Sequence, residues 1–250
     1  MSDSEKNLSI LGHFSEMRKR LIRSVIVLVI TIIVAFVFWK DLVEILMYPA
    51  PEGITLQAVK MTEMFGTTMR ICLVAGIILA MPYLTYELLM FVSPALTRSE
   101  KKYVYIVLPW IALMFIGGVV FAYFIMIPNI TAFLLNWGAD LITPQPMFSD
   151  YINIVTRMLL ISGLIFELPV LITFLARIGI IRPQWLASKW RGAVIISFIL
   201  AAIITPTPDP LNQSIVAGVL IFLYGLSLFL ARLVYRKKST DEKIEMSSSE

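Results

Sequence analysis

Long, continuous apolar runs constrain this chain more than any other feature of its sequence. Six runs follow one another, separated by polar segments, at about residues 21–39, 68–90, 103–127, 151–178, 190–204 and 213–234. A helix crosses the hydrocarbon core of a bilayer with about 20 apolar residues, and inside lipid its backbone polar groups must bond to one another. A transmembrane β-barrel would show alternating segments of about ten residues instead. The runs therefore predict an all-α polytopic membrane protein with six transmembrane helices.

Composition supports a membrane protein and argues against several other classes. Of the 250 residues, 58% are hydrophobic and 15% are charged, whereas a soluble domain has about 45–50% apolar and about 25% charged residues. The chain has one Cys and one His, which excludes a disulfide framework and argues against a zinc site, because such a site normally needs four ligands. We therefore expect no metal and no cofactor.

The basic residues predict how the helices are oriented. The formal net charge is +4, but no basic stripe with interleaved aromatic residues indicates nucleic-acid binding. Instead, 17 of the 21 lysines and arginines fall on one side of the predicted membrane, within segments 1–23, 98–102, 177–191 and 232–243. Cytoplasmic loops of membrane proteins carry an excess of Lys and Arg. Both termini are therefore predicted to be cytoplasmic.

The last two apolar runs are predicted to form short helices. The fifth run, residues 190–204, would give roughly 22 Å of helix, against a hydrocarbon core of about 30 Å. The strongly apolar part of the sixth run begins at Ile215 and is of similar length. We expect local thinning of the bilayer beside these helices. Residues 1–236 then form one six-helix integral membrane domain, and the polar residues 237–250 are expected to be a disordered cytoplasmic tail.

Glu167 is the most expensive residue to place in lipid. It lies near the middle of the fourth run, in SGLIFELPVL. A carboxylate at mid-membrane costs about 2.5–3.5 kcal/mol on insertion scales, so its side chain should face the bundle interior or a water-filled cavity. Pro169, two residues later, removes a backbone hydrogen bond and predicts a kink. Two interpretations stay open: a polar functional site inside the membrane, or a protonated, hydrogen-bonded structural glutamate.

Two further glutamates lie in basic segments on the predicted cytoplasmic side. Glu16 precedes the first run beside Arg18, and Glu100 follows the second run beside Lys101. Each acid could accept a hydrogen bond from a cationic ligand. Composition alone favours the simpler interpretation, in which each one pairs with a neighbouring cation.

Proline-rich segments mark two predicted outer turns. Residues 205–210 read TPTPDP, which cannot continue a helix, and Asp209 lies there without nearby cations. Pro49 lies in the first outer loop and is also a turn residue. Both segments are expected to be rigid turns.

No catalytic motif is present, so an enzyme is not expected. The sequence has no GxSxG, HExxH or P-loop pattern. An acid within the membrane does fit a proton-coupled small-solute transporter, with Glu167 as the proton carrier. The two halves of the chain show no inverted repeat, which counts mildly against this alternative.

Several segments together resemble one family. The segment HFSEMRKRL at residues 13–21 looks like the signature H-x-x-E-L-R-x-R-L, with Met17 in place of Leu. Five more segments follow in the expected order: TEMF, FVSPALTRSEKK, FAYFIMIP, FELP and TPTPDPLNQS. The set resembles the TatC family, the core subunit of the twin-arginine protein translocase, over roughly residues 8–235. The TEMF match is loose, with Met64 in place of the usual proline. The clearest departure from the pattern is Gly225, which follows Tyr224 where the family usually has Glu.

The resemblance implies a fold, a function and partners. It implies six helices in a cupped, glove-like bundle in the bacterial-type cytoplasmic (inner) membrane. It implies a receptor that binds twin-arginine signal peptides of folded precursor proteins, and transport driven by the proton-motive force. The implied partners are TatA and TatB subunits and further copies of the chain. The functional positions carried over are Glu16, Arg18, Phe91 and Glu100 on the cytoplasmic surface, Glu167 in the membrane, and Pro49 and Asp209 in the outer loops.

The residue types at the implied cytoplasmic site suit the binding of paired arginines. Fixed carboxylates bind arginine through bidentate, charge-assisted hydrogen bonds. Glu16 and Glu100 come from different segments on the same predicted membrane face, so they can converge on a pair of arginines. The surrounding Lys and Arg residues would repel a merely basic peptide. Phe91 could receive an apolar residue of the signal motif.

Overall fold

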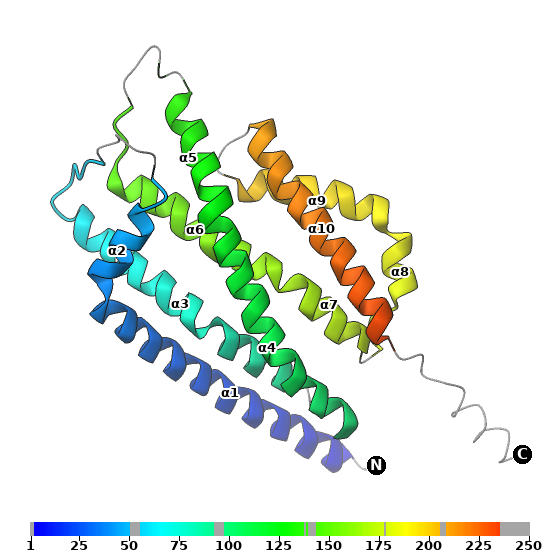
Figure 1. The fold of residues 1–250 in the computed structure, drawn as a ribbon. Coiled ribbons are helices and arrows are strands. Elements are labelled where there is room, and N and C mark those ends of the chain that lie inside the picture. The colour runs from blue at the N-terminus through cyan, green and yellow to red at the C-terminus, as the bar shows by residue number, and fades with distance from the viewer. Residues whose placement is uncertain are drawn as a thin grey trace, which may run out of the picture. The chain divides into compact units, whose positions relative to one another are not determined.

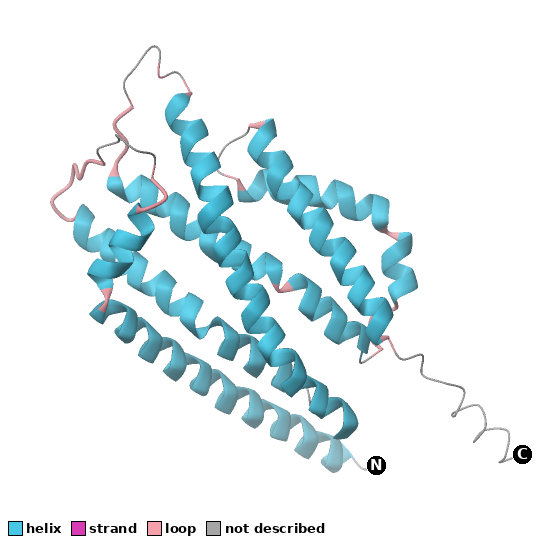
Figure 2. Ribbon diagram, in the orientation of Figure 1, coloured by secondary structure: helices cyan, strands magenta, loops and turns pink. Residues whose placement is uncertain are grey.

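The chain is nearly all helical (Figure 2). The computed structural model describes residues 3–50, 56–92, 98–137, 139, 144–177, 179–205 and 209–235, and side chains within residues 15–50, 56–90 and 108–235 of these ranges. Over the described residues, the β-structure consists of one isolated parallel bridge between Gln57 and Met147. The prediction of an all-α fold is confirmed.

Five described helical stretches are long and apolar enough to cross a membrane, and one apolar helix is shorter. The five are Ser15–Val37, Glu63–Met90, Leu108–Asn136, Phe148–Arg177 and Pro210–Val234, and the shorter one is Trp190–Ile204. They correspond in order to the six predicted runs. The backbone contacts divide the chain into two units, residues 1–163 and 164–250.

In the first unit, the long helix α1 (Asp3–Val37) packs along α3 (Glu63–Val92) (Figure 1). A glycine permits this close approach. A Cβ atom built on Gly76 would lie 2.7 Å from the Cα atom of Ile32 and 2.4 Å from its Cγ1 atom. Because only Gly lacks a Cβ atom, the two backbones can touch at this point. Most other side chains of α1 in this span are exposed, as expected for a helix that contacts lipid.

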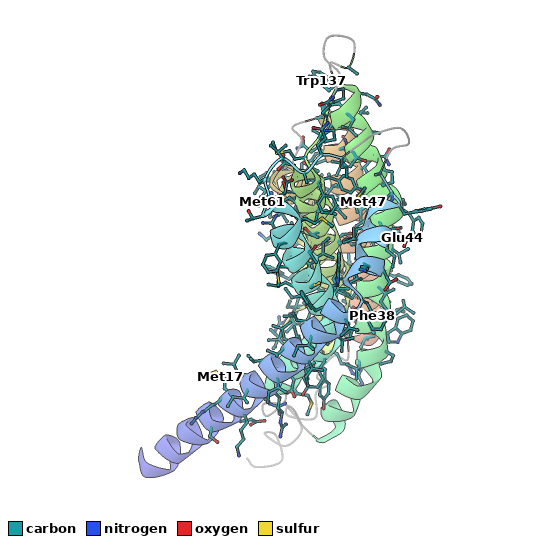
Figure 3. All side chains as sticks on the ribbon, turned by 90° about the vertical axis from the view of Figure 1, so that its left-hand side faces the viewer. Met17, Phe38, Glu44, Met47, Met61 and Trp137 are labelled. Atoms are coloured by element: carbon teal, nitrogen blue, oxygen red, sulfur yellow. The ribbon has the colours of Figure 1, made fainter. Side chains whose placement is uncertain are left out.

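A short helix follows α1 that the sequence did not predict. Helix α1 ends at Val37, and α2 (Trp39–Met47) begins after Phe38. Phe38 lies at the junction, with Glu44 and Met47 on α2 (Figure 3). Two tyrosine hydroxyls bond carbonyl groups near the end of α2: Tyr123 donates to Ile45 at 2.7 Å and Tyr151 donates to Leu46 at 2.9 Å. These bonds add partners to carbonyls in the last turn of α2, where few helical amides remain to bond them.

The third predicted run, residues 103–127, stops just before Pro128, but its helix continues past this proline. Helix α4 (Arg98–Phe121) continues through a π-helical turn, η2 (Ala122–Met126), into α5 (Ile127–Asn136). Pro128 occupies the first turn of α5, where its missing N–H group removes no bond within that helix. The wider π turn resets the hydrogen-bond register just before the proline. The helix is therefore longer than the sequence predicted.

The predicted interruption at Glu167 is confirmed. Helix α6 (Phe148–Phe166) ends one residue before it, and α7 (Leu168–Arg177) begins one residue after it. The Leu171 amide still donates to the Glu167 carbonyl at 3.0 Å, so the helical hydrogen bonds resume within a turn. Pro169 sits in the first turn of α7, where it lacks only an N–H group that a helix start leaves unbonded.

The second unit contains α7, α8 (Pro183–Ser188), α9 (Trp190–Ile204) and α10 (Pro210–Val234), and α10 packs against each of the other three. Helix α9 has 15 residues and the predicted bounds. The prediction that the last helix is short is wrong, because α10 has 25 residues. Its first turn contains polar residues, including Asn212 and Gln213, which precede the strongly apolar part of the run at Ile215.

Candidate functional site

An ion-pair cluster joins α1 to α3 in the first unit. Arg20 donates from Nη2 and Nε to Glu16 Oε1 at 2.6 and 3.2 Å, and from Nη1 to Glu87 Oε2 at 2.9 Å. The Tyr83 hydroxyl donates to the other oxygen of Glu87, Oε1, at 2.7 Å. One guanidinium therefore bridges two carboxylates that lie on different helices. We call Glu16, Arg20, Tyr83 and Glu87 the Arg20 cluster.

The antiparallel packing of α1 and α3 places these residues together. Ile32 contacts Gly76, and Arg20, three turns earlier on α1, contacts Glu87, three turns later on α3. Glu16 lies one turn before Arg20, so both side chains project from the same face of α1. The close approach at Gly76 thus sets the register that brings Arg20 to Glu87.

Exposure increases across the cluster from α3 to α1. The exposed fraction is 5% for the Glu87 side chain, 17% for Arg20 and 39% for Glu16. A buried carboxylate needs a partner to offset its lost hydration, and Arg20 and Tyr83 supply it for Glu87. With two acids and one guanidinium, these ionised groups carry a net negative charge, and its accessible part is Glu16.

Two exposed basic residues follow Glu16 along α1. Arg18 and Lys19 are exposed on α1. Together with Ser15 and Ile22 they line a surface hollow of about 480 Å³. The predicted site residue Arg18 therefore lies, like Glu16, near the start of the membrane span of α1. It borders a space that a ligand can enter, on a different face of the helix from Glu16.

Phe91 and Glu100 are the other two residues predicted for this surface. Phe91 belongs to the last turn of α3 and Glu100 to the first turn of α4. Their side chains lie outside the described residues. The convergence of Glu16 and Glu100 stays a prediction.

The remaining predicted positions lie elsewhere. Glu167 is buried, with 3% of its surface exposed, at the α6–α7 break. Pro49 is half-buried just beyond the end of α2. Asp209 is buried and caps α10, because its Oδ2 atom accepts a hydrogen bond from the Asn212 amide at 2.7 Å. This cap is a structural role for Asp209 that the sequence did not predict.

Glu87 is the residue that sequence reasoning missed. It lies in the second apolar run, in the segment LTYELLM. The cost of burying a carboxylate, which drew attention to Glu167, applies equally to Glu87. That signal was available in the sequence. Its partner was not, because Arg20 is 67 residues away along the chain.

A second buried acid stabilises the opposite end of α3. Glu63 Oε2 accepts hydrogen bonds from the backbone amides of Val59 and Lys60 at 2.9 and 3.2 Å, and Glu63 Oε1 accepts one from the Ser149 amide at 3.0 Å. The carboxylate therefore joins the loop before α3 to the start of α6. Across the described residues, no three His, Cys, Asp or Glu side chains gather closely enough to hold a metal ion.

Taken together, the apolar spans, the break in the fourth span and the buried acids with hydrogen-bond partners define a polytopic helical membrane protein. It has a charged site near the start of the membrane span of α1. The family model for "Sec-independent protein translocase protein (TatC)" matches residues 12–218. The chain belongs to the TatC family. It is a multi-pass component of the twin-arginine translocase and not an enzyme.

Individual relatives cover nearly the whole chain. A Sec-independent protein translocase protein TatC from Carboxydothermus hydrogenoformans is 35% identical over 240 residues, covering 96% of this chain and 99% of the relative. One from Desulforapulum autotrophicum is 36% identical and covers 100% of this chain and 94% of the relative. A crystal structure of the twin-arginine translocase receptor TatC superposes with a TM-score of 0.77 at 35% identity, covering 90% of this chain and 100% of that one.

Proposed function

We propose that this chain is the signal-peptide receptor of its translocase. In this proposal it binds the paired arginines of signal peptides on folded precursor proteins, and it organises their export across the membrane with the proton-motive force. The binding surface comprises Glu16, Arg18, Phe91 and Glu100. A solved relative of similar fold is described as the twin-arginine translocase receptor, which supports this assignment.

The observation that carries the proposal is the way Glu16 holds a guanidinium. Its Oε1 atom accepts two hydrogen bonds from Arg20, from Nη2 and from Nε. Such charge-assisted contacts suit the planar guanidinium group. Because Glu16 is 39% exposed, a ligand arginine can reach the same carboxylate from solvent.

Glu87 keeps the Arg20 cluster negatively charged, so that the Glu16 carboxylate can still attract a ligand arginine. If Glu16 alone faced Arg20, the pair would be neutral and would attract a ligand arginine weakly. Glu87 binds the same guanidinium from the opposite side at 2.9 Å, so the cluster keeps a net negative charge. The exposed Arg18 and Lys19 disfavour peptides that offer only diffuse positive charge. Both effects favour an arginine placed close to Glu16.

Site-specific crosslinking to a twin-arginine signal peptide tests the proposal. Probes at residues 16, 91 and 100 should crosslink to the peptide in the full-length protein. Glu16→Ala and Glu100→Ala should each abolish binding without unfolding the protein. Glu44→Ala, which removes an exposed acid from α2, is the matched control and should bind normally. Retained crosslinking to a well-folded Glu100→Ala variant would contradict the shared pocket.

We further propose that the hydrophobic part of the signal peptide lies near Glu167. The carboxyl group is buried at a helix break, and acids within membrane spans commonly mark functional sites. A crosslinking probe at residue 167 should capture the apolar part of the peptide and not its arginines. Family membership favours this role over a proton-coupled solute transporter. Deletion of the chain should block export of folded twin-arginine precursors and leave solute uptake unchanged.

The proposal includes orientation and partners. Both termini are placed in the cytoplasm of a bacterial-type cell, residues 1–236 form the membrane domain, and residues 237–250, outside the described part, form a polar tail. TatA and TatB subunits and further copies of the chain are the proposed partners. The short α9, about 22 Å long, suits docking of single-span partners in a locally thinned bilayer. Uniform lipid thickness around the purified protein would contradict the thinning.

Pro49 and Asp209 are proposed to act at the outer face. Asp209 caps α10, so a functional role must be separated from this structural one. Asp209→Asn keeps an oxygen that can accept the Asn212 amide bond and removes the charge. A folded Asp209→Asn variant that no longer exports precursors would support a functional charge, whereas normal export would assign Asp209 to capping alone.

A further inference from the structure

We propose that Arg70, Asn153 and Arg157 form a binding site for the phosphate of an anionic phospholipid. This inference goes beyond the receptor role and does not depend on it. The three residues lie on α3 and α6, within two of the candidate membrane spans. All three are exposed. We call them the Arg70 site.

The register of α3 and α6 places the two arginines at the same depth. Near the helix starts, the Ser149 amide bonds Glu63. Arg70 lies about two turns beyond Glu63, and Arg157 about two turns beyond Ser149, which corresponds to roughly 10–12 Å along each helix. A hydrogen bond from Arg70 Nη1 to Asn153 Oδ1 joins the helices between these levels. The two helices therefore run parallel, and both begin at the same end of the unit (Figure 1).

The three side chains belong to one face. Asn153 and Arg157 are four residues apart on α6, so their side chains lie one above the other. Asn153 accepts the bond from Arg70 and thereby orients that guanidinium. Helical side chains lean toward the N-terminal end of their helix. Both arginines thus lean toward the membrane surface at which α3 and α6 begin.

The positive charge of the two arginines favours an anionic ligand. A cation within a membrane span is costly unless it reaches the interface or meets an anion. Among residues whose side chains are described, neither arginine forms an ion pair. Two guanidiniums at equal depth match a phosphate, which arginine binds through bidentate hydrogen bonds. In the membrane interface the abundant phosphate is that of a phospholipid headgroup.

The neighbouring apolar surface favours a lipid over a free phosphate ion. Leu73, one turn beyond Arg70 and further into the span, is 49% exposed, and Met69 beside Arg70 is 40% exposed. An acyl chain attached to the bound phosphate would extend along this surface. Head and tail of one phospholipid therefore meet complementary groups on α3. In the proposed orientation, this lipid belongs to the leaflet that faces away from the cytoplasm.

Lipid retention tests the proposal in the full-length protein. The protein is reconstituted with phosphatidylglycerol and phosphatidylethanolamine and extracted in detergent, and the retained lipid is measured by native mass spectrometry. Wild type should retain phosphatidylglycerol preferentially. Arg70→Gln and Arg157→Gln should each reduce retention about fivefold, since a basic residue near an anionic surface contributes about 1 kcal/mol. Lys60→Gln removes an exposed cation near the same end and is the matched control.

A second variant guards against a fold defect. Asn153→Asp keeps both arginines but adds a carboxylate that pairs with Arg70, so it should also lose phosphatidylglycerol while its thermal midpoint stays at or above that of wild type. Equal retention by wild type and a folded double arginine variant would overturn the proposal. If soluble glycerol phosphate bound the two arginines as tightly as phosphatidylglycerol does, the ligand would be a free phosphate and not a lipid. Signal-peptide crosslinking from residue 16 is a separate readout and should be unchanged.

Discussion

Helix α3 carries a buried acid near each end, and the two acids have different partners. Glu63 bonds three backbone amides, whereas Glu87 bonds a guanidinium and a tyrosine hydroxyl. Backbone amides are fixed by the fold, so Glu63 joins segments permanently. Arg20 is shared between Glu87 and the half-exposed Glu16, so its bonds can be redistributed when a ligand arrives. Burial alone does not separate a structural acid from one that supports binding, but the type of partner does.

Glu63→Gln tests the acid at the start of α3 and should lower thermal stability the most. Glutamine keeps one acceptor oxygen, but its NH₂ group would face amide donors at either Val59 and Lys60 or Ser149. At least one donor would then lose its partner at a buried position. The thermal midpoint, measured in detergent by circular dichroism, should fall further than for any substitution in the Arg20 cluster. Glu44→Gln, at an exposed acid of α2, is the control, and an equal midpoint for the two variants would contradict this role of Glu63.

Glu87→Ala tests the other end. It leaves Arg20 with Glu16 alone and should lower the free energy of unfolding by about 2–3 kcal/mol, less than for a fully buried pair because Arg20 keeps one partner. Glu87→Gln should cost under about 1 kcal/mol, because the amide still accepts from Arg20 and can donate to the Tyr83 oxygen. Signal-peptide affinity should fall in both variants, since the charge on Arg20 then neutralises Glu16. Unchanged affinity in folded Glu87→Gln would limit Glu87 to a structural role.

Gly76→Ala tests the close packing of α3 against α1, which lies between the two acids. The new methyl group would meet the Ile32 backbone, and relief of this overlap should cost about 1–3 kcal/mol. A shift of α1 would also lengthen the contact between Arg20 and Glu87 and weaken peptide binding. Gly66→Ala is the matched control on the same helix, because a Cβ atom there has nothing within 4 Å. Equal stability of the two variants would show that the close approach can relax without cost.

Tyr83→Phe should have the smallest effect on signal-peptide affinity. It removes one hydrogen bond to Glu87 and leaves the Arg20 ion pairs in place. The expected loss is about 1 kcal/mol of unfolding free energy, with little change in peptide affinity. Chemical denaturation in mixed micelles provides the measurement. A loss of affinity comparable with that of Glu87→Ala would show that Tyr83, and not the charge of Arg20, controls the position of Glu87.

The sequence predicted the spans best where hydropathy and helix breakers agree. The bounds of α9 and the break at Glu167 match the structure. Prediction failed where the backbone accommodated a breaker or where a helix included polar residues. Pro128 does not end its helix because a π turn precedes it, and the polar start of α10 made that helix look short. Such local adjustments depend on packing, which hydropathy does not describe.

By itself, the sequence determined the membrane class, the order of the apolar spans and the family, because apolar length and short motifs are local properties. It also predicted that Glu167 would avoid lipid, and this residue is buried. Only the tertiary structure decided which charges meet. Arg20 reaches Glu87 across 67 residues, and Ser149 reaches Glu63 across 86. These partnerships depend on helix register, and in the first unit the close approach of the two backbones at Gly76 fixes that register for α1 and α3.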